Sequence, residues 1–560
     1  MPRCKTLPSL ALSLLALSPL SLSKAAAQVS LPQTVETAPL ATDAFSTGVL
    51  DRATGALPST LWRGAEPETL EYLLTYAPSR PAAPSLGEAM RRTLLSPGPG
   101  PQGAPASLGG RKLLALARAG FVEEARTVAS LSSAERGDPW VGQALAVADL
   151  LSGDVGAACR RSAGLASGRD EAFWVKLRVF CYAEAGERDA ADLTLNILRE
   201  QGGLSPADDA FLSIAATGAA PKTPPAARTA LQYAIGRAGE TPIAPGLIGE
   251  ADGGVLVAVA SDGMLDPATR IAAAERAVAM GVAGADMLAG VFQSAEFDLA
   301  DAGAAAAAAR QRPDDPLTDA LLYQSIRKMS APEFIRDKAQ RVALALGLGD
   351  SFHRAYALSV VYAEDIASLE GVLVSPEEAE RFATARMAVG DSVGAAQWLT
   401  AMIGPSESVA ALPEPLALTF IDRVMLLALL DPQTAARIAA SAGVALEAPA
   451  GRAYEAAARE GDAVMTARVV EAAFDAAIDG KAGQAGLAAL AASNGAGHGE
   501  IEAVVVRQSL QIAGMAELSR RYEFEKAWAA SFTPQGLPQG RTEPEERGFG
   551  PRLKPANSRQ

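Results

Sequence analysis

Three glycines recur in this chain at intervals of 33 residues, and an alanine follows each of them five positions later. The segments between them carry apolar residues at the spacing of amphipathic helices. Glycine suits the residue after a helix because it adopts a positive φ without a Cβ penalty. The pattern therefore predicts a repeated unit of helix, tight turn and helix. Its residues are Gly120 with Ala125, Gly153 with Ala158, and Gly186 with Ala191.

A weaker form of the pattern returns later in the chain. An acidic residue follows each turn position, and an alanine lies five or six positions after the turn residue. The interval between the first and last of these copies is 71 residues, which corresponds to about two repeats. The copies are Gly390-Asp391 with Ala395, Leu430-Asp431 with Ala435, and Gly461-Asp462 with Ala467.

This combination of glycine, acidic residue and alanine resembles the tetratricopeptide repeat, whose helical hairpins share the Gly-to-Ala spacing and a period near 34 residues. The resemblance covers residues 108–202 well and residues 375–475 loosely. The aromatic residue of the second helix and the closing proline of that family are missing or irregular here. The resemblance implies a degenerate tetratricopeptide-like or other α-α superhelix. A run of alanine-rich hairpins that arose by chance is the alternative.

Composition favours helices along most of the chain. Alanine is abundant and aromatic residues are only 5%, while β-branched residues rarely alternate with polar ones. We therefore expect an all-α fold, a right-handed α-α superhelix or solenoid of stacked helical hairpins. Helices with few aromatic side chains must approach closely to bury enough surface, and an alanine after each turn permits this approach.

A leader at the start of the chain predicts the cellular compartment. Arg3 and Lys5 precede a stretch of mostly Leu, Ala and Ser at 7–22, and three alanines at 25–27 offer small residues for cleavage. This arrangement is typical of a secretory signal peptide. We expect cleavage after Ala27 and a periplasmic or secreted product.

The charge balance argues against polyanionic partners. Lys and Arg total 50 against 64 Asp and Glu, a formal charge of −14, and removal of the leader would make the chain more acidic. An acidic chain repels phosphate backbones and anionic lipid surfaces. We therefore expect no nucleic acid partner. The longest apolar run after the leader, residues 424–430, is too short for an integral membrane span.

Proline and glycine clusters suggest a division of the chain. The breaks at residues 97–101 and 221–225 cannot continue a helix, and the six alanines at 304–309 are most simply a helix interior. The predicted parts are a signal peptide at 1–27, a flexible segment at 28–55, an N-terminal helical-repeat block at 56–220, a central and C-terminal helical-repeat region at 226–530, and a disordered tail at 534–560.

Two cysteines remain after leader cleavage, Cys159 and Cys181. They lie equally far from position 170, near the turn that joins one hairpin to the next. Antiparallel helices place such residues at the same height, so an oxidising compartment favours a disulfide between them. Two separate buried thiols are the alternative. A metal site is not expected there, because the nearest histidine in sequence is His353.

Short catalytic motifs occur in contexts that do not suit them. Residues 390–394 match the G-x-S-x-G nucleophile elbow, but the residues before them are expected to form a helix and the motif needs a preceding strand. Ser325 and Lys328 match S-x-x-K, without the K-T-G and S-D-N motifs that accompany it. The Glu407-Ser408 pair resembles the Glu-Ser pair of lytic transglycosylases, but the downstream motifs of those enzymes are absent. We therefore expect no catalytic, cofactor-binding or metal-binding residues.

The function predicted from these features is that of a non-catalytic, exported helical-repeat scaffold. Solenoids present extended surfaces, so we expect a protein or peptide partner on the concave face, in an envelope-associated assembly. The free ends of a solenoid would also permit self-association. An accessory regulator of a cell-wall polymer enzyme is the alternative, and an enzyme with an unrecognised site is a further one.

Overall fold

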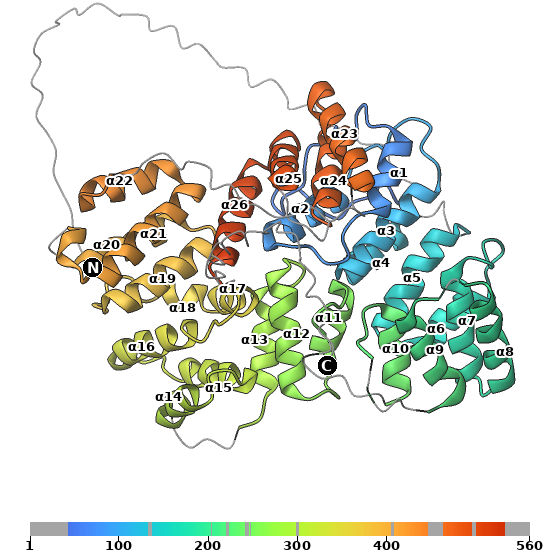
Figure 1. Ribbon diagram of the computed structural model, residues 1–560, viewed down its shortest axis with the longest axis horizontal. Coiled ribbons are helices and arrows are strands. Elements are labelled where there is room, and N and C mark those ends of the chain that lie inside the picture. The colour runs from blue at the N-terminus through green and yellow to red at the C-terminus, as the bar shows by residue number, and fades with distance from the viewer. Residues whose placement is uncertain are drawn as a thin grey trace, which may run out of the picture. The chain divides into compact units, whose positions relative to one another are not determined.

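A computed structural model describes residues 43–132, 137–202, 204–219, 223, 225–240, 246, 248–297, 302–404, 408–445, 463–494 and 500–532. These residues form helices joined by turns and loops, with no strand among them (Figure 1). The predicted all-α class is confirmed. The handedness of a superhelix stays a prediction, as does the division of the chain into helical blocks.

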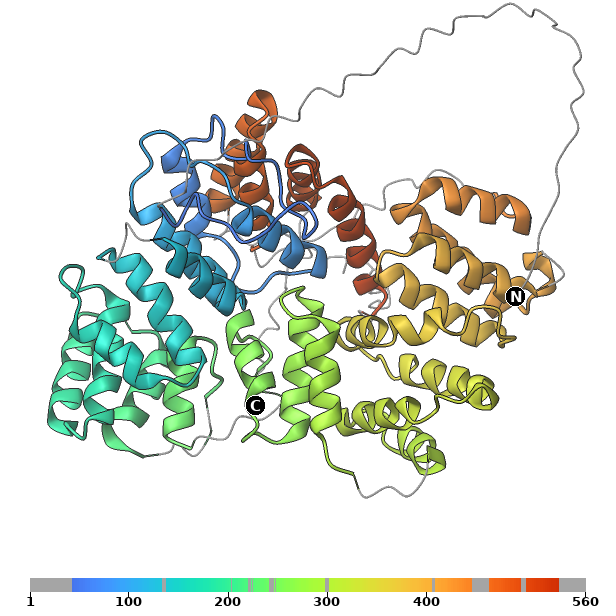
Figure 2. The ribbon, with the colours of Figure 1, turned by 180° about the vertical axis from the view of Figure 1, so that it is seen from behind.

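The first part of the described chain contains three consecutive hairpins. In each hairpin the two helices pack against each other, and neighbouring hairpins also pack together, as in a solenoid (Figures 1 and 2). The helices are α1 (Pro67–Thr75) and α2 (Pro84–Leu95), the hairpin helices α3 (Ser107–Ala119), α4 (Val122–Leu131), α5 (Pro139–Leu151), α6 (Val155–Ala163), α7 (Ala172–Glu184) and α8 (Arg188–Glu200), and then α9 (Pro206–Thr217) and α10 (Ala230–Ala238).

The middle of the chain continues as packed helices. The alanines at 304–309 lie inside a helix, α14, as expected. The helices here are α11 (Gly253–Ser261), α12 (Pro267–Ala279), α13 (Ala285–Ser294), α14 (Ala302–Gln311), α15 (Pro316–Arg327), α16 (Ile335–Leu346), α17 (Phe352–Val361), α18 (Ala363–Ala367), α19 (Pro376–Ala388), α20 (Ser392–Ile403), α21 (Glu414–Leu430) and α22 (Pro432–Ala442), with short 3₁₀ helices η2 (Pro332–Phe334) and η4 (Val409–Ala411).

Four helices follow, α23 (Ala463–Asp479), α24 (Ala482–Ala492), α25 (Glu500–Ile512) and α26 (Ala516–Ala530). They do not extend a solenoid away from its start, because α24 packs against α1 and α2, and α26 packs against α2 and α21. The Gly483 N–H donates to the Leu61 carbonyl at 2.8 Å across this contact. The sequence interpretation assumed free ends, whereas α1 and α2 contact α24, and α2 also contacts α26. Self-association stays a prediction.

Aspartate or serine followed by proline begins six of the described helices. The side-chain oxygen accepts a backbone N–H of the first turn, and proline at the first helical position lacks the N–H that would be left without a partner. Local sequence therefore fixes where these helices start. The capping residues are Asp138, Ser205, Asp266, Asp315, Ser375 and Asp431, at the starts of α5, α9, α12, α15, α19 and α22.

The folded part begins earlier than the sequence suggested. Residues 43–55 fall within the segment expected to be flexible, yet Ala44 and Phe45 are buried. The side chain of Lys112, on α3, is fully buried and donates to the carbonyls of Phe45 and Thr47 at 2.8 and 2.6 Å. Because a buried ammonium group needs such partners, these contacts hold the segment on α3. Leu61 lies in a turn before α1.

A buried charged cluster joins three helices of the middle region. The Arg354 guanidinium on α17 donates to both carboxylate oxygens of Asp319 on α15, at 2.7 and 3.0 Å. Glu275 on α12 lies beside them, and burial and the Asp319 charge raise its pKa well above the usual range. Burial and the Asp319 charge thus favour the protonated form of Glu275, which leaves one buried carboxylate facing one buried guanidinium.

Candidate functional site

The predicted turn glycines end the first helix of each hairpin in the left-handed region. Their φ angles are +118°, +79°, +79° and +80° for Gly120, Gly153, Gly186 and Gly390. An added Cβ would meet no atom within 4 Å at Gly153 or Gly186, so the backbone conformation itself requires glycine at these two turns. These turns bring α3, α5 and α7 into register as the first helices of successive hairpins.

The alanines that follow these turns are all buried. Ala125, Ala158, Ala191 and Ala395 lie early in α4, α6, α8 and α20 and are at most 2% exposed. A larger side chain at these positions would push the second helix away from the first, because interiors are close-packed. These residues therefore set the spacing within hairpins and do not contribute to a binding surface.

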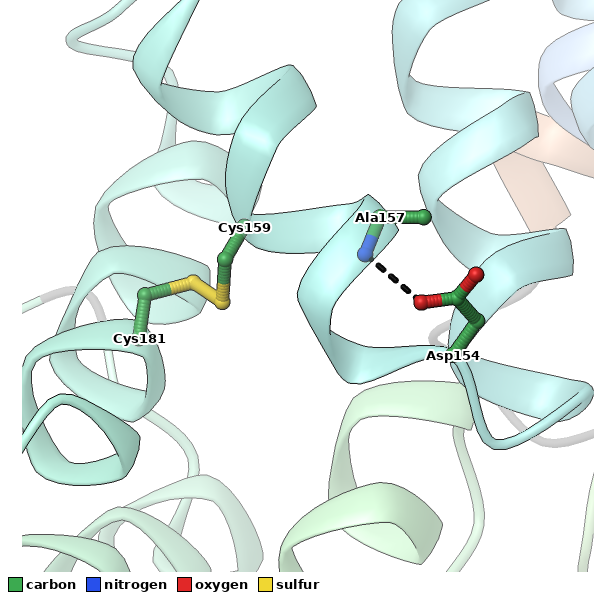
Figure 3. The surroundings of a disulfide bond; sticks show 4 residues. All are labelled: Asp154, Ala157, Cys159 and Cys181. Atoms are coloured by element: carbon green, nitrogen blue, oxygen red, sulfur yellow. Dashed lines mark hydrogen bonds between the residues drawn. A yellow bond between two sulfur atoms is a disulfide. The ribbon is translucent and has the colours of Figure 1, made fainter.

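The two cysteines form a disulfide between adjacent hairpins, in agreement with the sequence prediction. Cys159 lies on α6 and Cys181 on α7, and their Cα atoms are 5.5 Å apart, within the usual range for a disulfide (Figure 3). Asp154 begins α6 by accepting the Ala157 N–H at 2.8 Å (Figure 3). The bond thus links the second helix of one hairpin to the first helix of the next.

We expect the double substitution Cys159→Ala/Cys181→Ala to lower the free energy of unfolding by about 2–3 kcal/mol, because the disulfide restricts the unfolded chain. Denaturant titrations of the oxidised protein and the variant measure this difference. Reductant should lower the stability of the native sequence to that of the variant and leave the variant unchanged. Equal stability of the oxidised protein and the variant would contradict the prediction.

Two adjoining cavities lie along the first helices of the hairpins. One, of about 220 Å³, is lined by residues of α3, α5, α7, α9, α10 and α11 and by the residues before α10 and α11. The other, of about 200 Å³, is lined by residues of α1, α3 and α5 and by Ala77 after α1. Both are lined by Leu114, Arg118 and Gln143, so the two cavities adjoin, and together we call them the α3–α5 groove.

Aromatic side chains lie toward both ends of the α3–α5 groove. Trp140 lines the smaller cavity, and the Arg111 guanidinium stacks 4.0 Å above its ring. Arg111 also pairs with Glu71 of α1 at 2.9 Å, which fixes its position. Phe173 lines the larger cavity. Each of the two cavities therefore has one aromatic side chain in its lining.

The centre of the groove is polar. Arg118 is 44% exposed and contacts Asp252 at 3.5 Å, a long distance for an ion pair with a hydrogen bond. Gln143 lies beside it in both cavities and carries both a donor and an acceptor. An amide of this kind can pair with the N–H and C=O of an extended peptide, while the guanidinium can take a carbonyl or carboxylate.

A second ion pair closes the larger cavity. Lys176 of α7 donates to Asp208 of α9 at 2.7 Å, and Gln232 of α10 donates to the other carboxylate oxygen at 2.9 Å. Burial alone would raise the pKa of Asp208, but these hydrogen bonds outweigh it and hold the pKa below its usual value. Asp208 thus remains ionised and ties α7, α9 and α10 together around the groove.

The catalytic motifs do not assemble into a reaction centre in the part of the chain that the structure describes. Ser392 begins α20 after a helix, and its hydroxyl donates to Asp431 at 3.2 Å. The Ser325 hydroxyl donates to the Leu322 carbonyl at 2.8 Å. Glu407 and His498 lie outside the described residues. No group of three or more His, Cys, Asp and Glu among the described residues is arranged to hold a metal ion.

The sequence does not assign the residues of the binding face. The groove residues come from α1, α3, α5, α7, α9, α10 and α11, and α10 and α11 follow the predicted break at 221–225. Their convergence depends on tertiary packing that no local pattern signals.

Within the described residues, no helix combines the length and the apolar character needed to cross a membrane. Comparison of the chain with family models, curated proteins and solved structures gives no match.

Proposed function

We propose that the chain is a non-catalytic helical-repeat scaffold that binds an extended segment of a protein partner in the α3–α5 groove. The observation that carries the proposal is that two adjoining cavities follow the first helices of three hairpins, with shared polar residues between an aromatic side chain in each cavity. Extended peptides need backbone partners as well as pockets for side chains, and this arrangement offers both. The leader and the disulfide support a role in the periplasm or outside the cell, and the relationship to tetratricopeptide repeats remains part of the proposal.

Site-specific photocrosslinking in cells tests the proposal. A photoreactive amino acid at Gln143 should yield an adduct with one contiguous segment of a partner, identified by mass spectrometry. The same group at Thr127, exposed on α4, is the matched control and should not yield that adduct. Adducts of equal yield from both positions, or none from position 143, would contradict the proposal.

The affinity of a synthetic peptide with the captured sequence measures the role of the polar centre. We expect Arg118→Ala and Gln143→Ala each to weaken binding by about tenfold, because each removes a central polar contact. Thr127→Ala should leave the affinity unchanged. Binding that is unaffected by both groove substitutions would place the peptide elsewhere on the molecule.

A further inference from the structure

A third cavity lies where four segments far apart in the sequence meet. It has a volume of about 360 Å³ and is lined by residues of α2, α12, α17 and α26 and of the turn after α12. Its volume falls within the range of small-ligand sites. It does not share lining residues with the α3–α5 groove, so an inference about it is independent of the proposed function.

A guanidinium group with donors to spare lines this cavity. Arg521 of α26 donates from Nη2 to the Tyr356 hydroxyl of α17 at 3.2 Å, and the same atom lies 3.5 Å from Glu525. Among the described residues no other protein hydrogen bond is made by Arg521, so Nε and Nη1 are available to a ligand. Burial raises the pKa of Tyr356, so its hydroxyl stays protonated and can also donate. Together these groups suit a carboxylate.

Two carboxylates lie near the guanidinium in the same cavity. Glu517 of α26 is exposed, and Glu88 of α2 is 34% exposed and has only a long ion pair, at 3.6 Å, with Arg91. Both acids act electrostatically on Arg521 and help to raise its pKa. Because Glu517 is one turn from Arg521 on α26, negative and positive groups face the cavity from the same helix.

Arg92 of α2 also lines the cavity, and its Nε donates to the Gly55 carbonyl at 2.9 Å. The rest of the wall is apolar and has room for a short aliphatic group. Val278, Val360 and Leu518 contribute side chains, while Gly281 and Ala283 leave space between them. Gly281 has a φ of +69°, and an added Cβ would lie 2.2 Å from the Pro84 carbonyl oxygen. A bulkier residue therefore cannot fill this part of the wall without moving α2.

We propose that this cavity binds a small zwitterion, an α-amino acid or dipeptide, with its carboxylate on Arg521 and Tyr356 and its ammonium between Glu88 and Glu517. The aliphatic part of the ligand packs on Val278, Val360 and Leu518. A ligand of this kind contacts α2, α17 and α26 at once. It binds the folded chain alone, so it raises the thermal stability with the logarithm of its concentration once that concentration exceeds the Kd.

Calorimetry and thermal unfolding of the mature protein with L-leucine and the dipeptide Ala-Leu test this proposal. We expect saturable binding of at least one of them and a rise in Tm. The N-acetyl and C-terminal amide derivatives each lose one charge, so they should bind at least tenfold more weakly. No heat and no change in Tm at 10 mM, or equal binding of the derivatives, would overturn the proposal.

Two substitutions on α26 distinguish a loss of ligand binding from a loss of folding stability. Glu517→Gln removes one ammonium partner from an exposed position and should weaken binding about tenfold without changing the Tm of the free protein. Arg520 is an exposed residue of the same helix that does not line the cavity, so Arg520→Gln should leave binding unchanged. If Glu517→Gln binds the zwitterion as tightly as the native sequence does, the assigned orientation is wrong.

Discussion

The substitution Arg354→Met is expected to lower the free energy of unfolding at pH 7 by about 3–5 kcal/mol. Arg354 is the cation of the buried cluster, and its partner Asp319 is fully buried. Burial raises the pKa of Asp319 to about 6 even beside the guanidinium. Without Arg354, Asp319 must either remain charged in the interior or take up a proton. Because protonation is easier at low pH, the loss measured by denaturant titration should be smaller at pH 5 than at pH 7.

A control and a double variant distinguish this effect from the loss of packing. Arg312→Met removes an arginine that is 64% exposed and paired with Asp315 at 3.4 Å, so it should change the stability by less than about 1 kcal/mol. The double variant Asp319→Leu/Arg354→Met removes both buried charges and should recover most of the loss. A loss of less than 1 kcal/mol in Arg354→Met would show that the pair is not desolvated as the structure indicates.

Local features of the fold could be predicted because short stretches of sequence determine them. The turn glycines require a positive φ, and the structure has it at Gly120, Gly153, Gly186 and Gly390. The disulfide followed from the symmetry of Cys159 and Cys181 about a turn, since antiparallel helices fix which residues lie opposite. Both inferences use only the geometry of one hairpin or of two neighbouring ones.

Contacts between distant segments could not be predicted in this way. Gly253 begins α11, and a Cβ added to it would lie 2.0 Å from the Ala119 carbonyl oxygen of α3, yet glycine at this position resembles any loop glycine in the sequence. The buried Lys112 likewise resembles a solvated helix residue until the segment at 43–55 covers it. In both cases the requirement comes from a partner that is far away in the chain.

The residues of the α3–α5 groove could not be predicted from the sequence for the same reason. A repeat array predicts that a binding face exists, but it does not say which helices close its ends. Residues of α10 and α11 complete the groove, although they follow a proline-rich break in the sequence. Arg118 would be taken for a solvated residue near the end of α3, and only the packing of α11 brings Asp252 to it. The sequence shows the chemical character of each groove residue, but it does not show that these residues lie together in the fold.

The contact between α2 and α26 should depend on pH through Glu525. This side chain of α26 is buried, and its Oε2 accepts the Ser85 N–H and hydroxyl at 3.0 and 2.5 Å, at the start of α2. α2 lacks a capping side chain of its own, so Glu525 supplies the cap from 440 residues away. Burial raises the pKa of Glu525 from 4.5 to about 7, although Arg521 and Ser85 oppose this rise.

A carboxyl group with a raised pKa in the folded chain binds its proton more tightly there than in the unfolded chain. Its contribution to stability is complete below about pH 4.5 and is lost as the pH rises through about 7. The difference corresponds to about 3 kcal/mol. We expect Glu525→Gln, which keeps an acceptor for Ser85 but cannot ionise, to gain about this much stability relative to the native sequence between pH 4.5 and pH 8.

Denaturant titrations of both proteins across this range measure the expected change, because the other titrating groups are common to both and cancel in the difference. Arg520→Gln on the same helix alters charge without removing a buried acid, so its difference from the native sequence should stay constant. If the difference for Glu525→Gln is also constant, the pKa of Glu525 is not raised in the folded chain. The Ser85 donors and Arg521 would then outweigh burial, and the contact between α2 and α26 would rest on a permanent charge.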